Sequence, residues 1–291
     1  MRKYLSLVKF AHTLFALPFA LIGLMLGIQV MMSSADEPSN PYWLTAILVL
    51  MCMVFARNAA MAFNRLIDRE YDAQNERTAT REIPSGQISV TKARLFVALN
   101  AIAFIATTWY INLLCFFLSP VALAVILGYS YTKRFTALCH LVLGLGLSLA
   151  PVGAYLAVTA TFGWEPIILG LAVLTWVSGF DIIYALQDDG FDGKNGLHSI
   201  PAWLGRPRAL LVSTLLHVIS GSMILLFGWV IGGGWIFWVG AGLFISLLTY
   251  QHLLVKPNDL SKVNMAFFTT NGIASVLFAI FALAEVWLKN F

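Results

Sequence analysis

Long apolar segments recur along the chain and are separated by short polar connections. A helix needs roughly 20 mostly apolar residues to cross a bilayer, because lipid offers no partner to an exposed backbone amide. Nine segments are candidates, at 10–31, 42–63, 95–114, 116–131, 138–160, 167–186, 209–231, 234–254 and 265–288. The pattern predicts an all-α integral membrane protein with about nine transmembrane helices. The first segment is longer than the usual ~7 to 15 residue core of a signal peptide, so we expect it to be retained.

Composition supports the membrane interpretation. The 291 residues are 59% hydrophobic and only 11% charged, whereas soluble domains carry about 25% charged residues. The net charge of +4 comes without a long basic tract, which argues against nucleic-acid binding. The three cysteines have no CxxC spacing and therefore indicate neither a disulfide framework nor a zinc site.

The basic residues lie almost entirely on one side of this map. All of the 18 lysines and arginines except Arg57 and Lys289 fall at the N-terminus or in the alternate connections that share its side. By the positive-inside rule, we expect a cytoplasmic N-terminus and a C-terminus on the opposite side. Tryptophans near the predicted outer ends fit the same orientation, because indole rings prefer the headgroup level.

Acidic residues cluster in two connections on the basic side. Asn64, Asp68 and Asp72 are spaced by four, which on a helix places them one turn apart along one face. Tyr184, Asp188 and Asp192 repeat this spacing at the end of the sixth segment, and Asp181 lies a further turn back. We call these two sets the first and second acidic motifs.

Like charges one helical turn apart repel, and an acid near the apolar layer costs a few kcal/mol on insertion scales. A bound cation removes this cost, and carboxylate and amide oxygens suit Mg²⁺, which completes its shell with water and phosphate oxygens. Two such motifs facing each other would hold a metal-bound diphosphate. The alternative is a pair of solvated helix ends. Arg77, Arg81 and Lys133 follow on the same side, either as phosphate ligands or as ordinary interfacial anchors.

The surroundings of the two motifs are also alike. Asn75 and Asn195 each follow the last acid by three residues, and an Ile-Pro pair comes later in both connections, at 83–84 and 200–201. This weak repeat predicts two pseudo-repeated four-helix halves followed by a ninth helix.

These motifs resemble the UbiA superfamily of intramembrane aromatic prenyltransferases. The superfamily's NxxxDxxxD matches Asn64, Asp68 and Asp72, and its DxxxD matches Asp188 and Asp192. Residues 75–86 resemble its arginine-rich loop, and 129–134 resemble its YxxxK segment. Segments 10–19 and 179–188 look like the 4-hydroxybenzoate polyprenyltransferase branch. Segment 196–201 looks closer to a branch that prenylates a dihydroxynaphthoate on the way to menaquinone, because ubiquinone enzymes more often have lysine where His198 stands.

The resemblance covers nearly the whole chain and implies one prenyltransferase domain, 1–291, that uses Mg²⁺ and a polyprenyl diphosphate. The donor would be transferred to an aromatic acid, 4-hydroxybenzoate or a dihydroxynaphthoate, in the synthesis of ubiquinone or menaquinone. The implied metal ligands are Asn64, Asp68, Asp72, Asp188 and Asp192. The implied diphosphate ligands are Asn64, Arg77, Arg81, Tyr129 and Lys133.

The acceptor side of the site is less defined. Arg57 is a candidate for the acceptor carboxylate or for an ion pair with Asp181, and His12 and Tyr184 are further acceptor candidates. Asp181 is a candidate base or orienting group. The remaining histidines at 140, 217 and 252 lack metal-ligand spacing and receive no role.

The main competing class is a secondary transporter or ion-coupled channel, because buried acids and repeats also mark ion pathways. A transporter should place its acids near the bilayer midplane. Here all except Asp181 of the two motifs gather at one interface beside basic loops. We therefore favour a diphosphate-dependent enzyme of the cytoplasmic membrane whose active site faces the cytoplasm.

Overall fold

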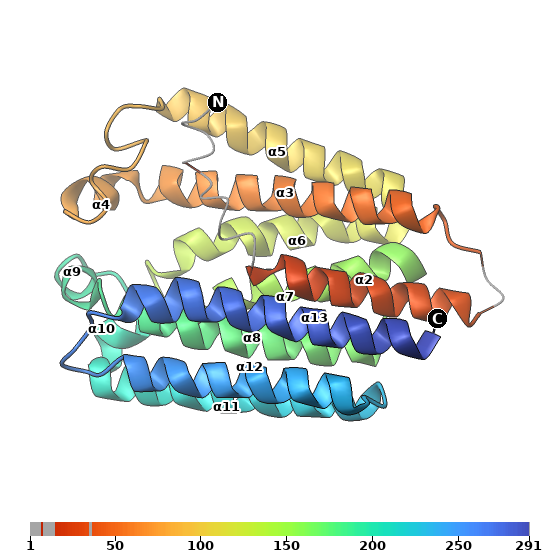
Figure 1. The fold of residues 1–291 in the computed structure, drawn as a ribbon. Helices are drawn as coiled ribbons and strands as arrows, with labels where there is room; N and C mark the ends of the chain where they lie inside the picture. Colours follow the sequence, from red (N-terminus) through yellow and green to blue (C-terminus); the bar gives the residue numbers. More distant parts are fainter. Residues whose placement is uncertain (1–6, 8–14, 35–36, 291) are drawn as a thin grey trace. The chain divides into compact units, whose positions relative to one another are not determined.

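The computed structural model describes residue 7, residues 15–34 and residues 37–290 (Figure 1). The regular structure of this part of the chain consists of helices joined by turns and loops, with one isolated bridge between Lys256 and Asp259. Eight of its helices are long and apolar enough to cross a membrane. A ninth apolar helix, α2, is shorter, and its residues overlap the first predicted span. The predicted all-α membrane architecture is confirmed.

The long helices carry the labels of Figure 1. They are α2 (Leu17–Met32), α3 (Tyr42–Ile67), α5 (Val90–Ile111), α6 (Leu113–Thr132), α7 (Cys139–Thr159), α8 (Trp164–Ala185), α11 (Arg206–Val230), α12 (Trp235–Leu254) and α13 (Asn271–Asn290). Short elements occupy the connections: α4 (Arg69–Gln74), α9 (Asp189–Lys194), α10 (Ile200–Leu204) and a π-helical segment, η2 (Met265–Thr270), that leads into α13.

The internal contacts divide the chain into two compact units. The first unit contains residues 39–131 and therefore α3, α4, α5 and α6 up to Tyr131. Of the described residues, the second unit contains 15–34, 37–38 and 132–290, and with them α2 and the helices from α7 to α13. Each unit carries one of the acidic motifs.

In the first unit, α3 packs against α5 (Figure 1). The Asn58 side chain donates a hydrogen bond of 3.1 Å to the side chain of Asn100, which joins the two helices within their apolar length. Asn40 donates to the carbonyls of Tyr110 and Ile111, at 2.9 and 3.0 Å, and so satisfies backbone acceptors at the end of α5.

In the second unit, α8 packs against both α7 and α11 and carries the fully buried Trp176. The first helix, α2, packs on α7 at positions where a side chain would not fit. A Cβ at Gly23 would lie 2.1 Å from the backbone oxygen of Pro151. This close approach places α2 with the second unit, so the contacts divide the helices differently from the two four-helix halves expected from the sequence.

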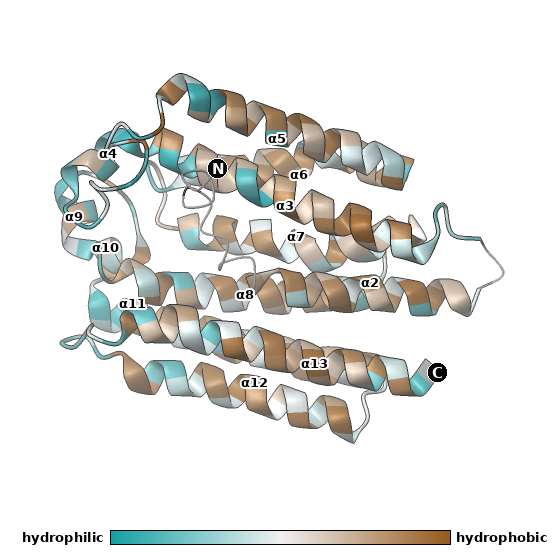
Figure 2. Ribbon diagram, turned by 45° about the horizontal axis from the view of Figure 1, so that its top comes forward, coloured by the Kyte–Doolittle hydropathy of each residue, from teal (hydrophilic) through white to brown (hydrophobic). Residues whose placement is uncertain are grey.

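Figure 2 shows apolar residues along the long helices and polar residues at α4 in the first unit and at α9 and α10 in the second. Many large apolar side chains are exposed on the helices. Exposed tryptophans mark several helix ends, including Trp43 at the start of α3 and Trp164 at the start of α8. Exposed apolar side chains along the helices, with tryptophans at the helix ends, are typical of a surface that contacts lipid. The chain is a multi-pass integral membrane protein.

Candidate active site

The first acidic motif lies where a long helix is followed by a short one. α3 ends at Ile67 and the six-residue α4 begins at Arg69, with Asp68 between them. The Asp68 amide donates to the Asn64 carbonyl at 2.9 Å, and the Asp72 amide donates to the Asp68 carbonyl at 2.8 Å. These bonds keep the predicted spacing of one turn although the regular helix ends between the residues. The Asn64 side chain also donates to a carboxylate oxygen of Asp68 at 3.1 Å.

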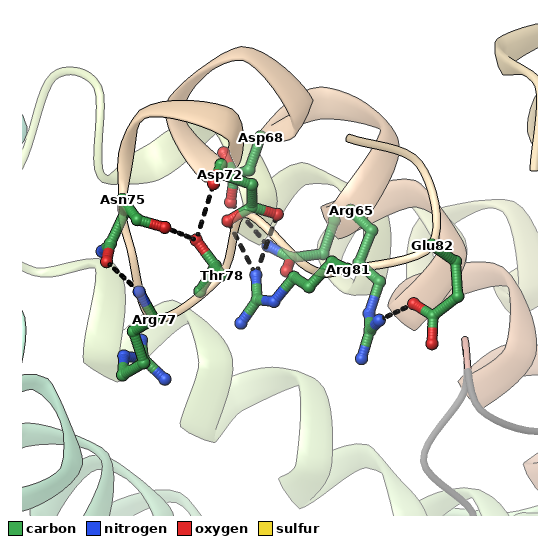
Figure 3. A network of polar contacts seen from close by, with 9 residues as sticks. Arg65, Asp68, Asp72, Asn75, Arg77, Thr78, Arg81 and Glu82 are labelled. Carbon is green, nitrogen blue, oxygen red and sulfur yellow. Dashed lines mark hydrogen bonds and ion pairs between the residues drawn. The ribbon is translucent and has the colours of Figure 1, made fainter. Parts of the chain in front are cut away.

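The loop after α4 folds back onto this motif (Figure 3). Nη1 of Arg81 donates to both carboxylate oxygens of Asp72, at 2.8 and 2.9 Å. The Thr78 hydroxyl donates to the Asp72 carbonyl at 3.1 Å, and the Arg77 amide donates to the Asn75 side chain at 3.0 Å. The side chain of Arg77 is exposed. The structure therefore brings Arg81 directly to one of the predicted metal ligands and leaves Arg77 at the surface of the same loop.

A buried ion pair holds this loop on the end of α3. Arg65 donates to Glu82, and their side chains are only 4% and 10% exposed (Figure 3). Next to the pair, Ile83 and Leu66 belong to one apolar cluster of the first unit. From the sequence, Arg65 was only one of the basic residues on the side of the N-terminus, and its contact with Glu82 was not predicted. The available signal was a basic residue one position after Asn64, near the end of an apolar run, with a glutamate in the loop that follows.

The second acidic motif has the same local construction. α8 ends at Ala185, the six-residue α9 begins at Asp189, and Asp188 precedes α9. The Asp192 amide donates to the Asp188 carbonyl at 2.8 Å, so these two acids also stay one turn apart. The additional acid, Asp189, accepts hydrogen bonds of 2.6 and 3.0 Å from Arg206. These bonds hold the pKa of Asp189 below its usual value.

The surroundings of Asp192 disfavour the charged form of its carboxyl. Burial raises the pKa of its carboxyl, and the negative charge of Asp188 adds to this shift. A hydrogen bond with Ser199 and the charge of Lys133 act in the opposite direction. The structure thus brings the predicted diphosphate ligand Lys133 close to Asp192. A cation bound here would relieve both the desolvation and the repulsion.

Asp181 and Tyr184 lie on α8, before the two aspartates of the second motif, Asp188 and Asp192. A carboxylate oxygen of Asp181 is 2.7 Å from Nδ1 of the buried His140. The ring of Tyr184 stacks on Phe267 from η2, with ring centroids 4.1 Å apart. His140 received no role from the sequence, because it lacks metal-ligand spacing. Its contact with Asp181 joins positions 41 residues apart, which local spacing does not reveal.

The remaining predicted residues have different outcomes. Arg57 and Tyr129, both in the first unit, interact electrostatically. His12 lies outside the described residues.

His217 and His252, which received no role from the sequence, form a hydrogen bond of 2.9 Å with each other. The side chain of His198 is exposed, while its amide donates to the Lys133 carbonyl at 2.6 Å.

The donor chemistry of both motifs fits Mg²⁺. Among the described residues no group of three or more His, Cys, Asp or Glu side chains gathers as a complete cage. Mg²⁺ does not require one, because it typically takes one or two carboxylates and keeps water or phosphate oxygens in its other positions. Each motif provides two carboxylates one turn apart, and the first adds the amide oxygen of Asn64.

The chain is similar to known proteins over most of its length. The model of the UbiA prenyltransferase family matches residues 16–273. The 4-hydroxybenzoate octaprenyltransferase of Idiomarina loihiensis is 32% identical over 263 residues, which cover 89% of each chain. The enzyme of the same name from Citrobacter koseri is 30% identical over 245 residues, which cover 84% of each chain.

Solved structures share the fold. The apo structure of a UbiA homolog from Aeropyrum pernix K1 superposes with a TM-score of 0.79 at 28% identity, over 96% of this chain and 98% of that one. A UbiA homolog from Archaeoglobus fulgidus bound to DMAPP and Mg²⁺ has a TM-score of 0.76 at 24% identity, over 98% and 99% of the two chains. With its helical fold and a family match over most of its length, the chain belongs to the UbiA prenyltransferase family, whose members are membrane-embedded transferases of prenyl groups.

Proposed function

We propose that this prenyltransferase acts as a single domain that transfers a polyprenyl group from polyprenyl diphosphate to an aromatic acid. The acceptor is 4-hydroxybenzoate or a dihydroxynaphthoate, and the product is a precursor of ubiquinone or menaquinone. The observation that carries the proposal is the pair of acidic motifs, each with an aspartate between a long helix and a six-residue helix. The UbiA homolog from Archaeoglobus fulgidus, which binds DMAPP and Mg²⁺, supports the same donor chemistry here.

The metal ligands would be Asn64, Asp68 and Asp72 of the first motif together with Asp188 and Asp192 of the second. Bound Mg²⁺ supplies positive charge to the diphosphate oxygens. Arg77, Arg81, Lys133 and Tyr129 are the groups of this chain proposed to bind the same oxygens. Arg81 is already oriented by its ion pair with Asp72, so its guanidinium is placed at the motif before any substrate arrives.

The reaction exchanges one bond for another. The bond between the first prenyl carbon and the diphosphate oxygen breaks, and its electron pair leaves with the diphosphate. A ring carbon ortho to the phenol forms the new carbon–carbon bond and then loses its proton. We assign Asp181 to orient the phenol or to accept a proton, and Arg57, Tyr184 and His12 to acceptor binding. Asp181 suits its role because its side chain is 22% exposed while one oxygen is held by His140.

Two observations bear on the acceptor. The curated relatives at 30% and 32% identity are named 4-hydroxybenzoate octaprenyltransferases, which favours 4-hydroxybenzoate. The segment 196–201, with His198, resembles the branch that uses a dihydroxynaphthoate, and His198 has an exposed side chain near the second motif. A transporter has no comparable support, because residues 16–273 match a transferase family.

The decisive experiment uses the purified protein in detergent with Mg²⁺, a polyprenyl diphosphate and each acceptor in turn. We expect one prenylated aromatic product and no product when EDTA replaces Mg²⁺. Absence of product with 4-hydroxybenzoate and with every dihydroxynaphthoate would contradict the proposed reaction. A product with only one acceptor class identifies the physiological substrate class.

We also propose that the protein lies in the cytoplasmic membrane with its N-terminus and active site on the cytoplasmic side and its C-terminus opposite. The one-sided placement of basic residues supports this orientation. Alkaline phosphatase fused to the C-terminus should be active in cells, and green fluorescent protein fused there should be dark. The reverse result would contradict the orientation.

A further inference from the structure

His140 lies at a junction of three chain segments in the second unit. It occupies the first turn of α7, and its side chain is 3% exposed. Its Nδ1 atom is 2.7 Å from Asp181 on α8. Its Nε2 atom is 3.3 Å from the amide nitrogen of Ile200, the first residue of α10. One buried ring therefore connects the proposed acceptor residue with the segment that follows the second acidic motif.

The two contacts define which ring nitrogen carries the proton. A backbone N–H can only donate, so Nε2 accepts from Ile200 and uses its lone pair for that bond. The ring proton is then on Nδ1, from which it is donated to the carboxylate of Asp181. With both nitrogens engaged, the ring orients its two partners and does not serve as a proton acceptor from the substrate.

The contact with Ile200 reaches the metal site through its neighbour Ser199. Ser199 is hydrogen-bonded to the carboxylate of Asp192, and its Oγ accepts from the Ala202 amide at 3.3 Å to cap α10. The residue before it, His198, is tied through its amide to the Lys133 carbonyl at 2.6 Å. His198 is thus held against the segment between α6 and α7, and Ile200 is held against the first turn of α7.

The backbone of His140 is itself fixed. The Ser178 hydroxyl of α8 donates to the His140 carbonyl at 3.1 Å. One turn further along α7, a Cβ at Gly144 would lie 2.3 Å from the Leu174 oxygen. The two helices approach closely because glycine is present there, which keeps the ring of His140 within reach of Asp181.

We propose that His140 is a positioning residue with two separable effects. Through Nδ1 it orients Asp181 for the aromatic acceptor, and through Nε2 it holds the Ser199 segment that places Asp192 for Mg²⁺. This inference rests on the proposed function for its acceptor half. Partners that orient metal ligands commonly change metal affinity by about 10- to 100-fold when they are removed.

Two amide variants, each of which retains one of the two hydrogen bonds, separate the effects. His140→Asn places an amide nitrogen where Nδ1 lies, so the bond to Asp181 remains while the acceptor for Ile200 is lost. His140→Gln places an amide oxygen near the position of Nε2, so the bond from Ile200 remains while the donor to Asp181 is lost. His217→Gln is the matched control, because His217 is also buried in the second unit but bonds to His252 and to the Trp176 carbonyl.

Two measurements are made on the full-length protein in detergent. In the first, the melting temperature is measured with inorganic pyrophosphate at increasing Mg²⁺ concentrations, and the Mg²⁺ midpoint is the concentration that gives half of the maximal stabilisation. This measurement requires no turnover. The second is kcat and KM for the aromatic acceptor at saturating Mg²⁺. We expect His140→Asn to raise the Mg²⁺ midpoint about tenfold or more with little change in acceptor KM. We expect His140→Gln to lower kcat/KM for the acceptor by a similar factor with a Mg²⁺ midpoint near that of the wild type.

The proposal would be overturned if the two His140 variants lost Mg²⁺ affinity and acceptor kcat/KM to the same extent. It would also be overturned if both variants behaved like the wild type, or if His217→Gln showed the same losses. If the wild type prenylates no acceptor, the proposed function fails. The Mg²⁺ midpoints with pyrophosphate still decide the role of His140 at Asp192, so the two failures are distinguishable.

Discussion

Arg65 and Glu82 form an ion pair that is almost completely withdrawn from solvent in the first unit. Taking two charges out of water costs several kcal/mol for each ion, and their attraction repays this cost only while both partners are present. The pair also closes the loop that carries Arg81. Its integrity therefore matters for both stability and the geometry around Asp72.

Removal of one partner should reveal this dependence. Glu82→Ala leaves Arg65 buried without its carboxylate, which we expect to cost about 3 to 5 kcal/mol of stability. Glu70→Ala is the matched control, because the Glu70 side chain is 75% exposed and its pair with Arg69 should contribute less than about 1 kcal/mol. Thermal unfolding in detergent compares the two variants. A loss no larger for Glu82→Ala than for Glu70→Ala would contradict the structural role of the buried pair.

The ion pair between Asp189 and Arg206 predicts a pH dependence. Arg206 lowers the pKa of Asp189 in the folded protein, so the pair contributes stability above the unfolded pKa of about 3.9. This contribution is lost as the pH falls through the lowered folded pKa. Asp189→Asn should therefore melt below the wild type at pH 7, and the difference should shrink as the pH falls below about 4. A melting difference that is constant with pH would contradict an electrostatic contribution.

The acids of the two motifs could be predicted from sequence, whereas the contacts that support them could not. Asp68 and Asp72, like Asp188 and Asp192, are one helical turn apart, and that relation is visible in the order of residues. His140 and Asp181 meet because α7 and α8 pack closely at Gly144. Such a contact depends on tertiary packing, which the spacing of residues along the chain does not report.

The sequence predicted the number of long helices more accurately than the residues at which they end. Apolar length identified the spans, but α3 continues to Ile67, beyond the predicted end at 63, and includes Asn64 and Arg65. At Asp68 and Asp188 the helices are interrupted, where a continuous helical face was expected. Aspartate competes with regular helix through local hydrogen bonds of its side chain and favours helix ends. Helical periodicity alone does not include this preference.

The π-helical segment η2 was also absent from the prediction. The Asn271 side chain donates to the carbonyls of Ala266 and Phe267, at 3.2 and 2.9 Å. The oxygen of the same side chain accepts from Trp176 at 2.9 Å and from Gln251 at 2.6 Å. These partners come from α8 and α12, so the irregular turn depends on packing between distant segments. Its consequence is the placement of Phe267 against Tyr184.

Two glycines of α7 provide a test of helix packing. A Cβ at Gly144 would lie 2.3 Å from the Leu174 oxygen and 2.4 Å from the Ser178 hydroxyl, whereas a Cβ at Gly153 meets nothing within 4 Å. Gly144→Ala should destabilise the protein by about 1 to 3 kcal/mol through overpacking. Gly153→Ala should be neutral or gain up to about 1 kcal/mol from helix propensity. Unfolding in detergent measures both, and equal effects would contradict close packing of α7 on α8 at Gly144.

For the molecule as a whole, composition predicted the lipid environment, but contacts between helices decided how the chain is divided. α2 directly precedes α3 of the first unit in sequence and yet packs with α7 and α13 in the second. The small residue Gly23 permits the approach to α7, a feature that hydropathy does not weigh. The two acidic motifs lie in different compact units. That both motifs bind one ligand in a single site is therefore a prediction about the whole protein.

That prediction has a thermodynamic signature. If both motifs bind one magnesium diphosphate, Asp68→Asn and Asp192→Asn should each abolish most of the thermal stabilisation by Mg²⁺ and pyrophosphate, and the double variant should lose little more. Residues that act as a unit are non-additive in this way. If each motif binds its own ligand, each single variant should retain the part due to the other motif, and the losses should add. Melting curves of the wild type and the three variants, measured across Mg²⁺ concentrations, distinguish one shared site from two independent sites.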